Sequence, residues 1–160
     1  MTGTAVITGA TGAIGSKLAE LLAERGFKLV LAARSQEPLN ALASRHGARA
    51  VTCDTTDAAQ VAALFAAAAE SGQPIKAVAH CVGSVFLKSL HLTSDDDWRG
   101  VMRQNLDSAF LVLRESVKAM RKGGGSVVLA SSAAARVGLS NHEAIAAAKG
   151  GIESLVASAA

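Results

Sequence analysis

The segment Thr8-Gly9-Ala10-Thr11-Gly12-Ala13-Ile14-Gly15 follows a short β-prone run, Thr4–Thr8, and leads into an apolar helical pattern. Gly9 permits a tight turn, Gly12 lets the backbone approach a pyrophosphate, and Gly15 lets helix and strand pack closely. The amino end of the helix offers free N–H groups and a positive dipole end to phosphates. The strand-turn-helix context therefore predicts a dinucleotide site. We expect its contacts from this loop to come from Thr8, Gly9, Thr11, Gly12, Ala13, Ile14 and Gly15.

Strand-like runs alternate with helical patterns along the whole chain, beginning with the run before this segment. The strand-like runs are Thr4–Thr8, Lys28–Ala33, Arg49–Cys53, Ile75–His80 and Ser126–Ala130. The helical patterns are Gly15–Glu24, Leu39–Arg45, Thr56–Glu70, a long helix from Ser94 to about Lys122, and a last helix that begins after Ser140. Apolar strands joined by helices are typical of a parallel sheet covered on both faces. We therefore predict one α/β domain over residues 1–160, a Rossmann-type doubly wound sheet in three α/β/α layers.

Two helix starts carry a capping-box pattern, a serine followed three residues later by an acidic residue. Ser94 with Asp97 opens the long helix, and Ser140 with Glu143 opens the last one. Between these elements, we expect residues 83–93 to form a loop or partial helix and residues 131–139 to form a loop.

Composition excludes several classes of function. The net charge of +3 comes without a basic stripe, which argues against nucleic-acid binding. No apolar run reaches membrane-spanning length, so we expect no membrane partner. Cys53 and Cys81 fit no metal spacing and are typical of small buried hydrophobes in a reducing compartment. No secretory signal precedes the first strand. We therefore expect a cytoplasmic protein without a metal site.

The end of the second predicted strand bears on the choice of dinucleotide. NAD-binding domains have an acidic residue near this point that holds the ribose 2′-hydroxyl, whereas this chain has Arg34 followed by Ser35. An arginine there can meet a 2′-phosphate. The sequence favours NADP(H) and leaves NAD(H) possible. The alternative interpretation of Arg34 is a solvated charge at a strand end.

With these residues identified, the whole chain resembles the short-chain dehydrogenase/reductase family. The resemblance rests on the glycine loop, Asp54 after the third strand, His80-Cys81-Val82-Gly83 in place of the family's Asn-Asn-Ala-Gly, Asn105 in the long helix, Ser131-Ser132 after the fifth strand, and Lys149-Gly150-Gly151. It implies hydride transfer between a nicotinamide and a carbonyl or alcohol carbon of a small molecule. Besides the loop, Arg34 and Ser35, the residues implied to contact the cofactor are Asp54, Cys81, Val82, Gly83, Asn105 and Lys149.

The resemblance also implies catalytic roles. Lys149 would lower the pKa of a neighbouring phenol and bind ribose hydroxyls, Ser132 would hydrogen-bond the substrate oxygen, and Asn105 would hold a water that connects the lysine to solvent. The position of the family's tyrosine, four residues before Lys149, is occupied by Ile145, and the chain contains no tyrosine. Isoleucine transfers no proton, and losing a general acid costs about 10²–10⁴-fold in rate.

His142 is the best substitute acid, because it lies three residues before Ile145 on the same side of the predicted helix. An imidazole side chain in general can both give and take a proton near neutral pH. His80 and Cys81 are alternatives that could approach the nicotinamide. The alternative interpretation of His142 is an exposed polar residue in a first helical turn, without a catalytic role.

Two main functions stay open, an NADP(H)-dependent oxidoreductase and a dinucleotide-binding sensor or regulator without turnover. A scaffold is a third, weaker reading.

Two further departures from the family pattern concern the glycine spacing and the carboxyl end. The commonest short-chain loop has a glycine at position 13, where this chain has Ala13. Family members continue beyond the last helix, so we expect a fragment or the ordered part of a longer reductase, with one apolar sheet edge left unpaired.

Helices 94–122 and 141–160 resemble the pair of helices that forms the family's subunit interface. This resemblance predicts a homodimer or homotetramer.

Overall fold

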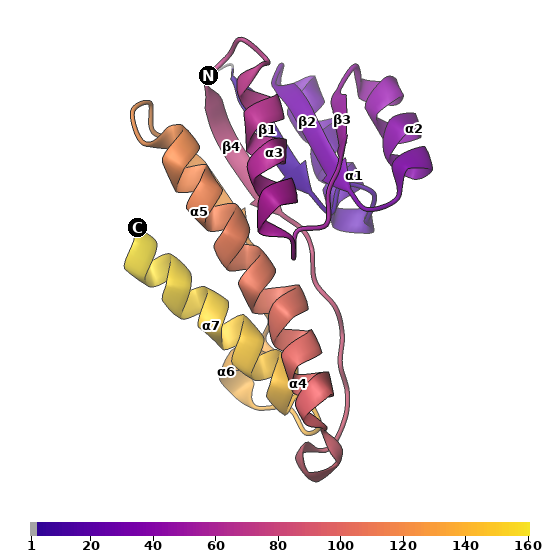
Figure 1. The fold of residues 1–160 in the computed structure, drawn as a ribbon, viewed down its shortest axis with the longest axis vertical. Helices are drawn as coiled ribbons and strands as arrows, with labels where there is room; N and C mark the ends of the chain where they lie inside the picture. The colour runs from indigo at the N-terminus through magenta and orange to yellow at the C-terminus, as the bar shows by residue number, and fades with distance from the viewer. Residues whose placement is uncertain (1–2) are drawn as a thin grey trace.

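A computed structural model describes residues 3–160 as a parallel five-stranded sheet with helices on both faces (Figure 1). The strand order is β3-β2-β1-β4-β5. Strands β2 and β3 are therefore added on one side of β1, whereas β4 and β5 are added on its other side, and the strand order changes direction between β1 and β4. The strands are β1 (Thr4–Thr8), β2 (Lys28–Ala33), β3 (Arg49–Thr52), β4 (Ile75–His80) and β5 (Ser126–Leu129). This order and the parallel pairing confirm the predicted Rossmann-type fold.

Seven α-helices are present within the described residues, and α5 and α7 run side by side, with α5 packed against β4 (Figure 1). They are α1 (Ala13–Glu24), α2 (Gln36–His46), α3 (Ala58–Ala69), α4 (Asp95–Met102), α5 (Ser108–Met120), α6 (Ala134–Val137) and α7 (Glu143–Ala159). A 3-10 turn, η1 (Leu90–Leu92), precedes α4, and a π-helical turn, η2 (Arg103–Asp107), joins α4 to α5. None of the helices described over residues 3–160 is long and apolar enough to span a membrane.

Alternate residues of the central strands form two separate cores. Val6 of β1 packs in a cluster with residues of α3 and α5, whereas its neighbours Ala5 and Ile7 pack in a cluster with residues of α1 and α2. All five residues of β1 are buried. Both faces of the sheet are therefore covered at its centre, which fixes the carboxyl ends of the strands as a rigid edge.

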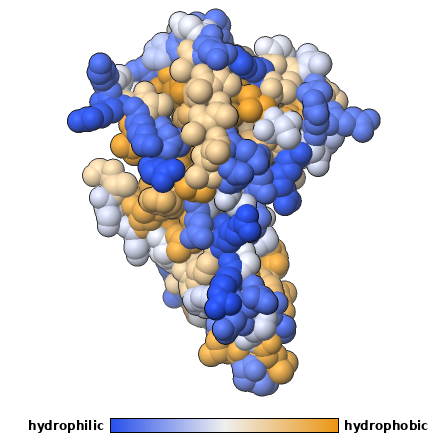
Figure 2. Space-filling view, viewed as in Figure 1, coloured by the Kyte–Doolittle hydropathy of each residue, from blue (hydrophilic) through white to orange (hydrophobic). Residues whose placement is uncertain are grey.

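At the outer side of the sheet, β5 pairs only with β4, and the side chain of Val128 is exposed. A second apolar surface lies at the far end of the molecule, where η1 exposes Leu90 and Leu92. Figure 2 shows the hydrophobic colour gathered at this lower end.

The predicted long helix is interrupted at its centre. In η2 the backbone N–H of Ser108 bonds to the carbonyl of Arg103, five residues earlier. The side chain of Asn105 donates to the carbonyl of Val101 at 2.9 Å and so takes an acceptor that an α-helical N–H would use. The sequence did not predict this interruption, because it depends on whether the carbonyl of Val101 accepts from a side chain or from a backbone N–H.

One of the two predicted capping boxes is correct. Ser94 Oγ accepts from the backbone N–H of Asp97 at 3.1 Å, and the Asp97 carboxylate accepts from the N–H of Ser94 at 3.0 Å. The prediction for Ser140 is wrong: Asn141 adopts a left-handed conformation with φ of 63°, and α7 begins only at Glu143 with His142 as its cap. The expected loop over residues 131–139 also contains the short helix α6.

Candidate functional site

A pocket of about 260 Å³ lies where the carboxyl ends of β1, β2, β3 and β4 meet. It is lined by Gly9, Thr11, Gly12, Ala33, Arg34, Ser35, Cys53, Asp54, Thr55, Cys81, Val82, Gly83 and Gln104. Nine of these residues are among those predicted from the sequence to contact a dinucleotide. They come from four separate strand ends and one helix start, so the fold brings together what the sequence separates.

The glycine loop is closed tightly enough that side chains cannot enter it. Gly9 has φ of 68°, and a Cβ there would lie 2.7 Å from the carbonyl oxygen of Cys81. Gly15 is buried, and a Cβ there would lie 2.8 Å from the Cα of Ala10. Gly15 therefore serves the packing of α1 against the loop and lines neither pocket described for this site.

The amino end of α1 is open to an anion. Its cap is Gly12, no side chain caps it, and its first turn contains no acidic residue. Ala13 and Ile14 in that turn are exposed. The free N–H groups and the helix dipole suit a pyrophosphate here, so the residues fit the dinucleotide that the sequence predicts.

Two charged side chains face the pocket from β2 and from the turn after β3. Arg34 is exposed and lines the pocket together with Ser35. Asp54 accepts from the backbone N–H and the hydroxyl of Thr56, both at 2.9 Å. These hydrogen bonds hold the pKa of the Asp54 carboxyl below its usual range. Asp54 is therefore ionised at neutral pH and presents an acceptor to the pocket.

A second pocket, of about 430 Å³, adjoins the first along β4. It is lined by Ile14, Cys81, Val82, Gly83, Ser84, Val85, Ala130, Ser131, Ser132, His142, Ile145 and Lys149. Cys81, Val82 and Gly83 line both pockets. An extended ligand that follows this segment would pass from the Arg34 pocket to the one that holds the predicted catalytic residues.

Lys149 reaches the second pocket from α7. Its ammonium donates to the carbonyl of Ala130 at 3.0 Å, and burial lowers the pKa of the ammonium. A Cβ added to Gly83 would lie 3.2 Å from Lys149 Nζ and 3.4 Å from Asn105 Oδ1. The absence of a side chain at Gly83 therefore leaves room for Lys149 of α7 and Asn105 of η2 beside the end of β4.

Asn105 is fully buried and holds η2 rather than facing either pocket. Its Oδ1 accepts from the backbone N–H of Ser84 at 3.0 Å, and its Nδ2 donates to Ser84 Oγ and to the carbonyl of Val101, both at 2.9 Å. The amide therefore ties the turn to the segment after β4. These contacts leave the resemblance-based role, a water held by Asn105, as a prediction.

Ser132 lies in the loop after β5, where its Oγ accepts from the N–H of Ala134 at 3.2 Å. The neighbouring Ser131 Oγ lies 3.0 Å from the carbonyl oxygen of Lys149 and 2.9 Å from Glu153 Oε1. Glu153 also pairs with Arg136 of α6 at 2.9 Å. These contacts tether the Ser132 loop to α7 and so to Lys149.

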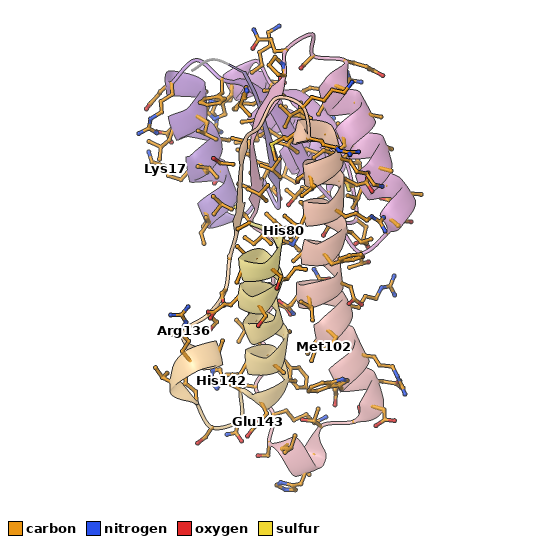
Figure 3. All side chains as sticks on the ribbon, turned by 90° about the vertical axis from the view of Figure 1, so that its left-hand side faces the viewer. Lys17, His80, Met102, Arg136, His142 and Glu143 are labelled. Atoms are coloured by element: carbon orange, nitrogen blue, oxygen red, sulfur yellow. The ribbon has the colours of Figure 1, made fainter. Side chains whose placement is uncertain are left out.

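Ile145 and His142 both line the second pocket from the start of α7. Ile145 is buried in an apolar cluster with Val101, Ala144 and Ala148. His142, labelled in Figure 3, has Nδ1 at 2.8 Å from the carbonyl oxygen of Ser140. A carbonyl can only accept, so Nδ1 donates this hydrogen bond, and Nε2 is the ring nitrogen that can exchange a proton with a substrate.

The suggestion that His80 could approach the nicotinamide is wrong. Its side chain is buried between Thr8 and Ser108 and lines neither pocket. Desolvation by burial, with a smaller effect of the Lys149 charge, lowers the pKa of His80 to about 4. Thr8 likewise turns its hydroxyl to His80 instead of the pocket. Cys81 lines both pockets, and burial raises the pKa of its thiol.

Sequence reasoning missed Ser84, which anchors Asn105, and Gln104, which lines the first pocket from η2. Ser84 had a signal, because it directly follows the Val82-Gly83 segment at a strand end. Gln104 had no such signal, because the direction of its side chain depends on the π turn.

Within residues 3–160 the structure contains no cluster of three or more His, Cys, Asp or Glu side chains that could hold a metal ion.

Comparisons with known proteins agree with this geometry. A family model described as enoyl-(acyl carrier protein) reductase matches residues 9–160. A short-chain type dehydrogenase/reductase of Picea abies is 31% identical, with 93% of this chain and 60% of the relative covered. D-threitol dehydrogenase of Mycolicibacterium smegmatis is 35% identical, with 92% and 59% covered. The NADP-dependent (R)-specific alcohol dehydrogenase of Lentilactobacillus kefiri is 32% identical, with 98% and 64% covered.

Among solved structures, a variant of actinorhodin polyketide ketoreductase with NADPH superimposes with a TM-score of 0.90 at 26% identity, with 96% of this chain and 62% of that chain covered. The chain thus spans about three fifths of the length of the relatives it matches. The family-model match extends over nearly all of the chain, and it agrees with the fold, the glycine loop and the arrangement of strand ends. The chain therefore belongs to the short-chain dehydrogenase/reductase family.

Proposed function

We propose that this protein is an NADP(H)-dependent oxidoreductase that acts on the carbonyl or alcohol group of a small molecule. The observation that carries the proposal is the pair of adjoining pockets, one with Arg34 and the open end of α1, the other with Ser132 and Lys149. The relatives are dehydrogenases and reductases, which supports an oxidoreductase in general.

The preference for NADP(H) rests on Arg34. Its guanidinium lines the first pocket beside Ser35, where a 2′-phosphate would receive charge-assisted hydrogen bonds. One relative is NADP-dependent by name, and the ketoreductase was solved with NADPH. Both facts support the same choice.

A bound nicotinamide dinucleotide supplies or accepts the hydride. The chain's own residues have the remaining tasks. Ser132 Oγ donates to the substrate oxygen, and the Lys149 ammonium binds ribose hydroxyls and adds positive charge beside the pocket. His142 transfers the proton at Nε2, because Nδ1 is held by the carbonyl of Ser140 and Ile145 has no proton to give. As the imidazolium it would donate to the oxygen of a carbonyl that is reduced, and as the neutral imidazole it would accept the proton of an alcohol that is oxidised. Gly83 leaves room for Lys149 and Asn105 to approach the strand end.

Dinucleotide binding without turnover is the alternative, and the burial of Ile145 among apolar side chains is the observation that favours it. A sensor of this kind would need the first pocket and the end of α1 but no proton donor. The two functions share the binding step and differ only in hydride transfer.

The deciding experiment titrates the protein with NADPH and NADH by nicotinamide fluorescence and then measures NADPH oxidation over a panel of ketones and aldehydes. The proposal expects tighter binding of NADPH and turnover that falls about 10²-fold or more in His142→Gln. His91→Gln, an exposed histidine in η1, is the matched control and retains turnover. Binding without any turnover would establish the alternative, and no binding of either dinucleotide would refute both.

We also propose that α5 and α7 form a homodimer interface, because Phe110, Val117 and Val156 are exposed large apolar side chains on these two helices. Sedimentation velocity is expected to show a dimer or tetramer, and Val117→Glu is expected to shift it towards monomer. A monomer at all micromolar concentrations would contradict this.

A further inference from the structure

His80 ends β4 in the middle of the molecule, between the sheet and the helix formed by α4, η2 and α5 (Figure 3). Its side chain is only 2% exposed. Nδ1 lies 2.8 Å from Thr8 Oγ1, and Nε2 lies 3.2 Å from Ser108 Oγ. Both ring nitrogens are therefore used, one towards β1 and the other towards α5.

The hydrogen-bond directions follow from Ser108. Its hydroxyl donates to the carbonyl of Gln104 at 2.7 Å, so its oxygen accepts from His80. Nε2 is therefore the protonated nitrogen, and Nδ1 accepts from the hydroxyl of Thr8. The imidazole is neutral in this arrangement. Burial and the nearby Lys149 charge keep it so, by lowering the pKa of His80 to about 4.

The two hydrogen bonds of the His80 ring form a bridge from Thr8 to Ser108, and each end of this bridge is next to a part of the candidate site. Thr8 directly precedes Gly9, the residue whose positive φ starts the glycine loop. Ser108 and Gln104 belong to the π turn and its cap, and Gln104 lines the first pocket. Asn105, next in the turn, holds Ser84 at the end of the segment shared by both pockets.

We propose that His80 is a positioning residue that couples the glycine loop to the π turn η2, so that dinucleotide affinity depends on a hydrogen-bond chain running from Thr8 through His80 and Ser108 to Gln104. The inference rests on the proposed dinucleotide binding. It assigns His80 no contact with a ligand, and it explains why two polar side chains of different elements are buried at one point. An unpaired polar group there would destabilise the fold, because a buried group without a hydrogen-bond partner has lost its water.

Ser108 and Ser116 provide a matched pair for the test. Both are fully buried serines of α5, and both donate to the carbonyl four residues earlier at 2.7 Å. Only Ser108 also contacts His80, and it lines neither pocket of the site. Ser108→Ala is expected to raise the Kd for NADPH about tenfold, because losing one buried hydrogen bond is worth about that factor. Ser116→Ala is expected to change the Kd less than about twofold.

Substitutions of His80 itself test the bridge from its centre. His80→Asn keeps one donor and one acceptor and is expected to bind NADPH within about threefold of wild type. His80→Leu keeps the volume without the hydrogen bonds, and we expect its Kd to rise at least about tenfold. Amide hydrogen exchange of the ligand-free proteins gives a second readout. In Ser108→Ala and His80→Leu, exchange is expected to accelerate in both residues 8–12 and 103–108, which are distant in the sequence.

Exchange measured without ligand separates this inference from the proposed function. Wild-type protein that binds neither dinucleotide would refute the proposed function, and the coupling would then be judged by exchange alone. Equal Kd values for Ser108→Ala and Ser116→Ala, or faster exchange confined to residues 103–108 in Ser108→Ala, would overturn the coupling. If His80→Leu fails to fold, the serine pair still decides.

Discussion

Ile145 lies one helical turn before Lys149 on α7, and both side chains line the pocket that contains Ser132. Of these two residues, only Lys149 brings a polar group to the pocket. The position from which the family's phenol would act is therefore occupied by an apolar side chain, while the ammonium that would tune the phenol is present.

Replacing Ile145 with tyrosine is expected to place a hydroxyl beside Lys149. Because a positioned general acid contributes about 10²–10⁴-fold, adding Ile145→Tyr to His142→Gln is expected to raise NADPH-dependent ketone reduction above that of His142→Gln alone by a factor in this range. Ile145→Phe is the control, since it has the same ring without the hydroxyl and carries the same cost of packing into the apolar cluster. Equal rates for the Tyr and Phe variants in steady-state assays would contradict the prediction.

Arg34→Gln is expected to weaken NADPH binding selectively. Losing charge-assisted hydrogen bonds to a 2′-phosphate is worth about 10–100-fold in Kd, whereas NADH offers that guanidinium no phosphate. Fluorescence titration of both dinucleotides checks this. Arg45→Gln, an exposed arginine in the last turn of α2, is the control and is expected to bind both as wild type does. A parallel loss of NADPH and NADH affinity on Arg34→Gln would argue against 2′-phosphate recognition.

Gly15→Ala is expected to damage the loop itself. The added Cβ would meet the carbonyl oxygen of Gly9 and lie 2.8 Å from the Cα of Ala10, and backbone cannot move aside as a side-chain tip can. We expect a loss of about 1–3 kcal/mol in the free energy of unfolding, together with weaker NADPH binding.

The matched control for Gly15→Ala is Gly100→Ala in α4, where a Cβ would meet nothing within 4 Å. Alanine is the better helix former by about 1 kcal/mol, so this variant is expected to be as stable as wild type or more stable. Urea denaturation measures both variants. Similar midpoints for the two would show that α1 has more space against the loop than the structure gives it.

Acid is expected to destabilise the fold through His80. An unfolded imidazole takes up its proton near pH 6.5, whereas the buried one takes it up only near pH 4. Between these values the unfolded chain binds more protons, so stability falls as the pH is lowered from 7 to 4. The loss from this group is about 3 kcal/mol when it is complete.

The comparison with His80→Asn isolates this contribution, because asparagine does not titrate. Urea denaturation at a series of pH values is expected to give a wild-type stability that falls more steeply than that of the variant between pH 6.5 and 4. Parallel pH profiles for the two proteins would mean that His80 is not held neutral by the fold.

The parts of this protein that follow local rules could be predicted from the amino-acid sequence. Three glycines between a strand and a helix fixed the loop, apolar runs separated by helices fixed the parallel sheet, and Ser94 with Asp97 fixed the start of α4. Each of these rests on groups within a few residues of one another, or on a pattern that every parallel sheet with covered faces must show.

The directions in which the polar side chains of the site point depend on the packing of distant segments and were visible only in the folded chain. His80 was an alternative residue that could approach the nicotinamide, and it instead bridges Thr8 and Ser108, which lie 72 and 28 residues away in the chain. Asn105, for which the resemblance implies a bound water, also bonds to Ser84 and to the carbonyl of Val101 at the π turn, and the sequence did not predict these contacts. A buried polar group takes whichever partners the packed elements bring within reach, and that choice is made by contacts between distant segments rather than by the residues beside it.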